Sequence, residues 1–225
     1  MASKGLYSDR STILENAIRS VFVKAGFPTI IQTVVSKDGL KKRTDIEVKN
    51  FAYDRSNGRY KSLHIDATVI ETQSPTYMEK SVTRRGLSID DASRKKKVKY
   101  IEECDPSFFY AAAISKYGLV TLEFEKLIRL AAEAYLKKNE SFILLPADTQ
   151  SMAIATQTKD FLTNIMVESM PAIIKSYDRA FHLVLNHQKQ INPVAYQRIS
   201  EQSESSFLSL SEIQSLADRG NRSYY

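Results

Sequence analysis

A lysine in the middle of the apolar face of a predicted helix constrains this chain more than any other feature. Segment 88–104 (SIDDASRKKKVKYIEEC) has helical periodicity, with Ser88 as the expected N-cap and Asp91 at the capping-box position. At about 100° per residue, one face collects Ile89, Ala92, Ser93, Tyr100 and Cys104. Lys96 falls at the centre of that face. A lysine that points into a packed face either extends its amine to solvent or pairs with a buried carboxylate or phosphate.

The carboxylates that can pair with this lysine lie earlier in the sequence, on segments that have the composition of strands. The β-branched run 29–35 (TIIQTVV) predicts one strand, and the alternating segments 44–51 and 60–71 predict two more. Asp45 lies on the polar face of the second strand, and Asp66 lies on the polar face of the third. The two aspartates are therefore candidates for a site shared with the helical lysine.

The predicted elements follow the order helix, three-strand meander, helix, strand and helix, which is an α/β arrangement. The remaining core segments are helices at 11–25 and 119–137, a strand at 107–114 and a polar loop at 73–87. In the first helix, Thr12 and Glu15 form an expected capping box. We expect these elements to make one α/β core over residues 1–139.

Beyond this core the character of the chain changes. Two helices are predicted near 148–168 and 171–189, with Pro171 at the break, inside a helical extension that covers 140–199. The serine-rich segment 200–225 is expected to be a flexible tail.

The net charge is mildly basic and locally concentrated. Thirty-two Lys and Arg residues against 26 Asp and Glu residues give a net charge of +6 and a pI near 9.2. Much of the surplus lies in segments 37–61 and 80–99. Such clusters suit a polyanion such as nucleic acid, and they are equally typical of solvated helix and loop faces.

Cysteine and hydropathy patterns exclude several classes of protein. Cys104 is the only cysteine, so there is no intramolecular disulfide and no cysteine-based zinc cluster. No apolar run approaches the length of a membrane span, and the N-terminus lacks the apolar stretch of a secretory signal. We therefore expect an intracellular, soluble protein that has no membrane partner.

Four short motifs, in a fixed order, carry a family resemblance. The chain reads R-T-D at 43–45, L-H-I-D-A-T-V at 63–69 and A-S-R-K-K-K-V-K-Y at 92–100, and then has a strand that ends in Y-G at 117–118. This pattern resembles the endonuclease-like segments found downstream of retroelement reverse transcriptases, which are similar to the PD-(D/E)XK nuclease superfamily. The resemblance implies a restriction-endonuclease-like core with a C-terminal helical extension, and metal-dependent hydrolysis of phosphodiester bonds in DNA or RNA.

The resemblance also implies roles for particular residues. Asp45 and Asp66 would hold Mg²⁺ or Mn²⁺, which prefer oxygen ligands, and a lysine would assist the phosphate chemistry. In the superfamily that lysine lies two residues after the second acid, or on the following helix. Thr68 occupies the first position here, so Lys96 is the natural substitute. Accessory candidates are Glu15 and His64. The basic cluster in segment 80–99, rather than the resemblance, supplies the candidates for nucleic-acid contact, which are Arg84, Arg85, Lys95, Lys97 and Lys99.

The pairing of the second and third strands decides whether the two aspartates can meet. A two-residue turn at 57–58 would place Asp45 opposite Ile70, which is four residues, on the order of 13 Å, from Asp66. The aspartates lie opposite each other only with a looser hairpin, made by a four-residue loop or by a bulge near Tyr53. The nuclease hypothesis therefore requires an irregular hairpin.

Each candidate also has a plainer interpretation. Asp45 and Asp66 can lie on a solvated sheet face, and Lys96 can extend its amine to water. His64 is more typical of a hydrogen-bonded polar residue than of a ligand. The sequence therefore leaves open a non-catalytic nucleic-acid-binding protein, or a structural protein that forms homo-oligomers through the 148–189 helices.

Overall fold

The computed structural model describes residues 3–35, 42–56, 58–72, 74–84 and 86–191. Its elements are α1 (Ser3–Lys24), β1 (Thr29–Val34), β2 (Arg43–Asp54), β3 (Arg59–Ile70), α2 (Pro75–Thr83), α3 (Leu87–Tyr100), a 3-10 turn (Pro106–Phe108), β4 (Phe109–Ser115), α4 (Leu122–Leu136), α5 (Glu140–Ile143) and α6 (Ala147–Ile191). The predicted α/β class is confirmed. None of the helices in the described ranges combines the length and the apolar character that crossing a bilayer requires.

The chain forms two compact units, residues 1–176 and 177–225. The first unit holds the sheet and its covering helices. The second is described only over the last turns of α6, which ends at Ile191. The predicted 140–199 extension is thus divided between the units, and the 200–225 tail lies outside the described residues.

The four strands form one mixed sheet in the order β1-β2-β3-β4. β1, β2 and β3 are antiparallel neighbours, whereas β4 pairs with β3 in parallel. A parallel neighbour requires a crossover connection, and α2 and α3 provide it. β3 is therefore an interior strand with partners on both sides.

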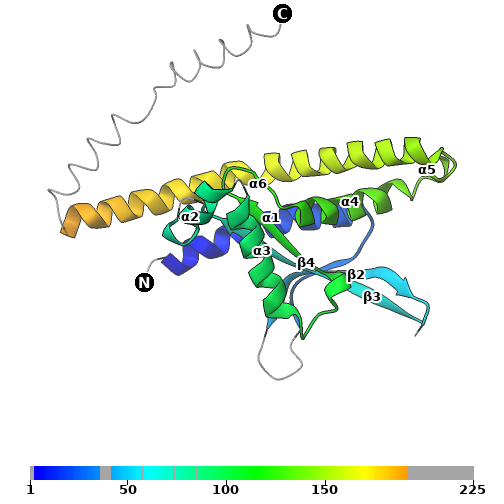
Figure 1. Ribbon diagram of the computed structural model, residues 1–225, viewed down its shortest axis with the longest axis horizontal. Helices are drawn as coiled ribbons and strands as arrows, with labels where there is room; N and C mark the ends of the chain where they lie inside the picture. Colours follow the sequence, from blue (N-terminus) through cyan, green and yellow to red (C-terminus); the bar gives the residue numbers. More distant parts are fainter. Residues whose placement is uncertain (1–2, 36–41, 57, 73, 85, 192–225) are drawn as a thin grey trace, which may run out of the picture. The chain divides into compact units, whose positions relative to one another are not determined.

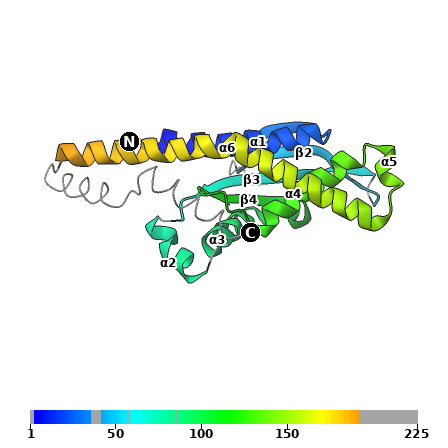
Figure 2. The same ribbon diagram turned by 90° about the horizontal axis from the view of Figure 1, so that it is seen from above.

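Helices cover both faces of this sheet, with α1 on one side and α3 on the other (Figures 1 and 2). Alternate residues of β3, such as Leu63 and Ile65, join the main core with α1, α4 and the α6 residues Phe161 and Ile165. On the opposite face, α3 packs through smaller clusters, one of which includes Ile70. A polar β3 residue that faces α3 is consequently enclosed rather than solvated.

The irregular hairpin that the aspartate pair requires is present in the structure. Asp54 pairs with Arg59, which leaves a four-residue loop in place of the two-residue turn. The register then shifts again between Val48 and Ala52, where β2 has extra residues that form a bulge, and Asn50 takes a left-handed φ of 55°. From Val48 back to Ile46 the strands pair in the register that aligns the two aspartates.

Helix α3 begins and ends earlier than the sequence pattern predicts. Its N-cap is Gly86 at φ 85°, rather than Ser88, and no side chain caps it. The predicted capping-box residue Asp91 instead forms ion pairs with Lys80 at 2.6 Å and with Arg94 at 2.7 Å. The helix ends at Tyr100, because 101–104 forms turns.

Three further helix predictions need correction. Thr12 and Glu15 do not cap α1, because that helix begins at Ser3. The predicted polar loop contains α2, a short helix with a proline in its first turn, where the missing N–H costs nothing. Pro171 lies inside α6 without ending it. An interior proline costs a helix about 3 kcal/mol through the lost N–H donor and the clash of its ring with the preceding turn, and packing of the buried Ile165 and Ile173 on either side offsets this cost.

The bulge at Asn50 gives a direct test of how the register is fixed. Asn tolerates a left-handed backbone, whereas a β-branched residue does not. We expect Asn50→Val to lower the free energy of unfolding by about 1–2 kcal/mol. Asn50→Gly, the matched change at the same exposed position, should leave it unchanged or slightly higher. Urea unfolding measures both values, and equal stabilities for the two variants would show that the bulge does not depend on this conformation.

Candidate functional site

Two aspartates approach each other where β2 and β3 pair in the shifted register. Asp66 lies in the interior strand and its side chain is only 2% exposed. Asp45 lies at the corresponding level of β2, just before the regular ladder begins at Ile46. Its carboxylate accepts a hydrogen bond from the backbone N–H of Ala67 at 2.7 Å. This bond holds the Asp45 side chain against the strand that carries Asp66.

Lys96 reaches the same place from helix α3. Its ammonium nitrogen lies 2.8 Å from Asp66 Oδ1, and its side chain is 31% exposed. The lysine therefore crosses the packed face of α3 and pairs with a buried carboxylate, while part of its side chain remains open to water. Such a partly buried pair holds its partner in place, but removal of either member leaves an uncompensated charge.

The other oxygen of the same carboxylate has no cation or amide as a partner. Asp66 Oδ2 is buried, and no ammonium, guanidinium or amide N–H of the described residues reaches it; the Asp45 carboxyl lies within hydrogen-bond reach of Asp66 and donates to it only when it carries a proton. A buried acceptor without a donor is costly, and a hard cation is one way to satisfy it. No set of three or more His, Cys, Asp or Glu side chains in the described part of the chain is arranged to hold a metal ion. The site thus offers two carboxylates, which is the usual protein contribution to a Mg²⁺ that keeps several waters.

Burial and neighbouring negative charge act strongly on Asp45. Desolvation, together with a hydrogen bond between the two carboxyls and the charges of Asp66 and Glu15, raises the pKa of Asp45 to about 8. The Ala67 N–H opposes this shift but does not cancel it. The metal-free site therefore retains one proton near neutral pH, because the single ammonium of Lys96 does not offset the surrounding acids.

Two further side chains adjoin the pair. Glu15 of α1 is 6% exposed, and burial raises its pKa, with Asp66 adding to the rise and Lys96 opposing it. Tyr100, one turn beyond Lys96 on α3, is 1% exposed and donates its hydroxyl to the backbone carbonyl of Arg43. Burial and the charge of Asp66 raise the pKa of this phenol. The helical wheel places Tyr100 on the apolar face of this helix, and its spacing of four from Lys96 is the signal that places it beside the aspartates.

His64 lies two residues before Asp66 but contacts a different partner. Its Nδ1 is 3.3 Å from Thr44 Oγ1, and it pairs across the sheet with Glu47. Burial lowers the pKa of the imidazole, which favours its neutral form.

The predicted nucleic-acid contacts are mostly exposed side chains that already pair within the chain. Arg84 pairs with Asp90 at 3.1 Å, and Lys95 pairs with Asp91 at 3.1 Å. Lys99 donates to the Tyr100 hydroxyl at 3.0 Å. Arg85 lies outside the described residues. These pairs are the weak kind that a phosphate can compete with at a surface.

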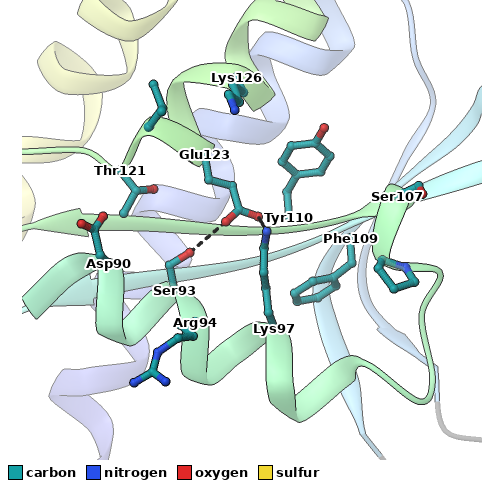
Figure 3. A pocket seen from close by; sticks show the side chains of 12 residues that line it. Asp90, Ser93, Arg94, Lys97, Ser107, Phe109, Tyr110, Thr121, Glu123 and Lys126 are labelled. Carbon is teal, nitrogen blue, oxygen red and sulfur yellow. Dashed lines mark hydrogen bonds and ion pairs between the residues drawn. The ribbon is translucent and has the colours of Figure 1, made fainter. Parts of the chain in front are cut away.

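Lys97 points away from the aspartates, into a cavity of about 540 Å³ between α3, the start of β4 and the start of α4 (Figure 3). There its ammonium lies 2.9 Å from Glu123, which also accepts a hydrogen bond from Ser93 at 3.1 Å. One helical step thus separates a lysine at the aspartate pair from a lysine with an unrelated partner. Lys97 is the natural control for Lys96.

No protein-family model matches the sequence, and no curated protein matches it significantly.

The shifted pKa of Asp45 predicts the pH dependence of stability in the metal-free protein. Between pH 3.8, its ordinary pKa, and about 8, the unfolded group is ionised while the folded group holds a proton. The unfolded state then binds fewer protons, so the free energy of unfolding should fall as pH rises through this window, by at most about 1.4 kcal/mol per pH unit for one proton. Asp45→Asn should remove this component. Urea unfolding with a chelator across the window measures it.

A matched control isolates the effect. Asp160 is an exposed aspartate of α6. In Asp160→Asn the free energy of unfolding should change with pH as it does in the wild type. If it also does so in Asp45→Asn, then Asp45 does not hold the proton.

Proposed function

We propose that the sheet and its covering helices form a metal-dependent endonuclease-like domain of the PD-(D/E)XK type, which hydrolyses phosphodiester bonds in DNA or RNA. The observation that carries this proposal is the meeting of Asp45, Asp66 and Lys96, with the lysine 2.8 Å from Asp66. The three residues come from two strands and a helix. They are the residues that the family resemblance singles out.

A bound Mg²⁺ or Mn²⁺ would activate a water molecule and neutralise charge on the scissile phosphate. Asp45 and Asp66 are the residues that would hold it. The Oδ2 of Asp66, which no cation or amide of the described residues reaches, supports this assignment. So does the proton that Asp45 retains, because a cation can replace that proton.

Lys96 has two tasks in this proposal. Its ammonium orients the Asp66 carboxylate through one oxygen and leaves the second oxygen available. Its partial exposure also lets it approach a phosphate at the surface and stabilise negative charge that develops there. Glu15, which is buried nearby, adds negative charge that favours retention of a cation.

The element order supports a restriction-endonuclease-like core, with α2 as an additional helix before α3. The position two residues after Asp66 is Thr68, and the lysine lies on the following helix instead. Because the common lysine position is occupied by Thr68, the proposed phosphate chemistry depends on Lys96.

The second candidate function is nucleic-acid binding or assembly without catalysis. The observation that favours it is the Lys96–Asp66 ion pair, which compensates the charge of Asp66 without a metal. Assembly has separate support in the exposed apolar residues of α6, among them Met152 at 72% and Val167 at 68% exposure. The partner would then be a second copy of the chain, bound through residues 148–189, which the structure shows as part of the single helix α6.

Cleavage assays with paired lysine variants separate these functions. Lys96→Ala should lower Mg²⁺-dependent cleavage of DNA or RNA by roughly 10²–10³-fold, the usual effect of losing one charge-stabilising donor. Lys97→Ala, one helical step away, should leave cleavage nearly unchanged. Asp66→Asn should abolish it, because it removes a proposed ligand while preserving side-chain volume.

Folding and binding are measured for the same variants. If Lys96→Ala and Lys97→Ala have equal, mild effects on cleavage, or if no variant or metal shows cleavage, the nuclease proposal fails. Nucleic-acid binding that survives Asp66→Asn without metal would then support the non-catalytic alternative.

The basic surface predicts salt-dependent binding in either case. Affinity for nucleic acid should fall steeply with salt, and Lys95→Glu should weaken binding to every sequence and reduce the salt slope by about one. The control is Lys137→Glu at the C-cap of α4, because both lysines are 57% exposed and both pair with an acid four residues earlier. Fluorescence anisotropy at several salt concentrations measures the affinity of both variants. If the salt dependence of the affinity is the same for Lys95→Glu and Lys137→Glu, the surface around Lys95 does not contact the nucleic acid.

A further inference from the structure

A second, smaller pocket lies where β3 and β4 end and α3 begins. Its volume is about 340 Å³. Most of the residues that line it carry a hydroxyl group or are glycines, among them Thr72, Ser81, Gly86, Ser88, Ser115 and Gly118. The parallel register places Ile70 opposite Ser115 and Asp66 opposite Ala111. The pocket is therefore four residues, roughly 13 Å, along the sheet from the aspartate pair.

Ser88 is the unusual member of this lining. Its side chain is 1% exposed, and its hydroxyl oxygen has no hydrogen-bond partner. The neighbouring hydroxyls are engaged, since Ser81 donates to the carbonyl of Thr72 at 2.9 Å and Ser115 accepts from the N–H of Leu119 at 2.9 Å. A buried hydroxyl without a partner is costly in a folded protein. A ligand that accepts a hydrogen bond in the pocket would remove that cost.

The N-terminus of α3 adds positive potential at the same place. α3 is a 14-residue helix whose N-cap, Gly86, supplies no side chain to the first amides. The amide of Leu87 donates to the Arg84 carbonyl at 3.1 Å and that of Ile89 to the Gly86 carbonyl at 3.0 Å, so the helix dipole, rather than a set of free amides, favours an anion there. The acids of the first turns do not line the pocket, and they are neutralised elsewhere: Asp90 by Arg84, and Asp91 by Lys80.

The charge of the lining indicates the ligand class. No carboxylate is among the described residues that line the pocket, so a cation would find no counter-charge there. An oxyanion would find the Ser88 hydroxyl and the start of a helix. We propose that this pocket binds a phosphate group, either free phosphate or a phosphate of a nucleic-acid strand. This proposal does not depend on cleavage at the aspartate pair.

Inorganic phosphate is the first probe, used with the full chain. Phosphate should raise the melting temperature in a saturable manner, and Ser88→Ala should weaken the apparent affinity by roughly tenfold, as expected for the loss of a hydrogen bond to a charged group. Without phosphate, Ser88→Ala should melt at the wild-type temperature or above it, because the substitution removes a partnerless hydroxyl. The control is Ser141→Ala, at an exposed serine of α5. Non-specific stabilisation by phosphate acts on all three proteins alike.

A short oligonucleotide is the second probe and distinguishes the two sources. If Ser88→Ala weakens both probes relative to Ser141→Ala, the pocket accepts free phosphate. If it weakens only the oligonucleotide, the ligand is a strand phosphate. Equal affinities of the two variants for both probes overturn the proposal. Asp66→Asn, which should abolish cleavage, should leave the response to phosphate intact, so failure of the nuclease proposal is recognised separately.

Discussion

The pairing of β2 with β3 is the constraint on which the site depends. Side chains of a strand alternate between its faces, so a one-residue slip would move every side chain of β3 to the other face. Leu63 and Ile65 would then leave the core shared with α1 and α4, and Asp66 would enter it. The four-residue loop and the bulge each change the pairing by two residues, so they leave the apolar residues of β3 on the core face. Their combined effect is to move Asp45 from the level of Ile70 to the level of Asp66.

The charges at this position do not balance. Asp45, Asp66 and Glu15 lie within electrostatic reach of one another, and Lys96 is the cation that interacts with them most closely among the described residues. A site selected only for stability would gain from an apolar replacement, because buried ion pairs rarely stabilise more than well-packed hydrophobic residues. An excess of buried acid that retains a proton near neutral pH is instead typical of a site that exchanges the proton for another cation.

Sequence reasoning reached the element types and the aspartate–lysine arrangement because these follow from local periodicity. Alternation identified β2 and β3, and the helical wheel placed Lys96 on the packed face of α3. Tertiary context decided the rest. Gly86 displaces Ser88 as the N-cap through a backbone conformation that no periodicity reveals, and α2 is too short to show a pattern. The bulge depends on a left-handed Asn50, and the partnerless hydroxyl of Ser88 is a property of what surrounds it.

The two candidate functions differ in what they require of the aspartates. A protein that only binds nucleic acid gains from its cations, and an acidic pair near the same surface repels the phosphate backbone. Lys96 offsets one charge, yet no ammonium, guanidinium or amide of the described residues reaches the second oxygen of Asp66. A divalent cation between the carboxylates and a phosphate converts this repulsion into attraction, because it serves as the counter-ion of both. Binding of a polyanion at this face and retention of the aspartates are therefore compatible through a bound cation, which is why metal dependence, rather than affinity alone, is the property that discriminates between the functions.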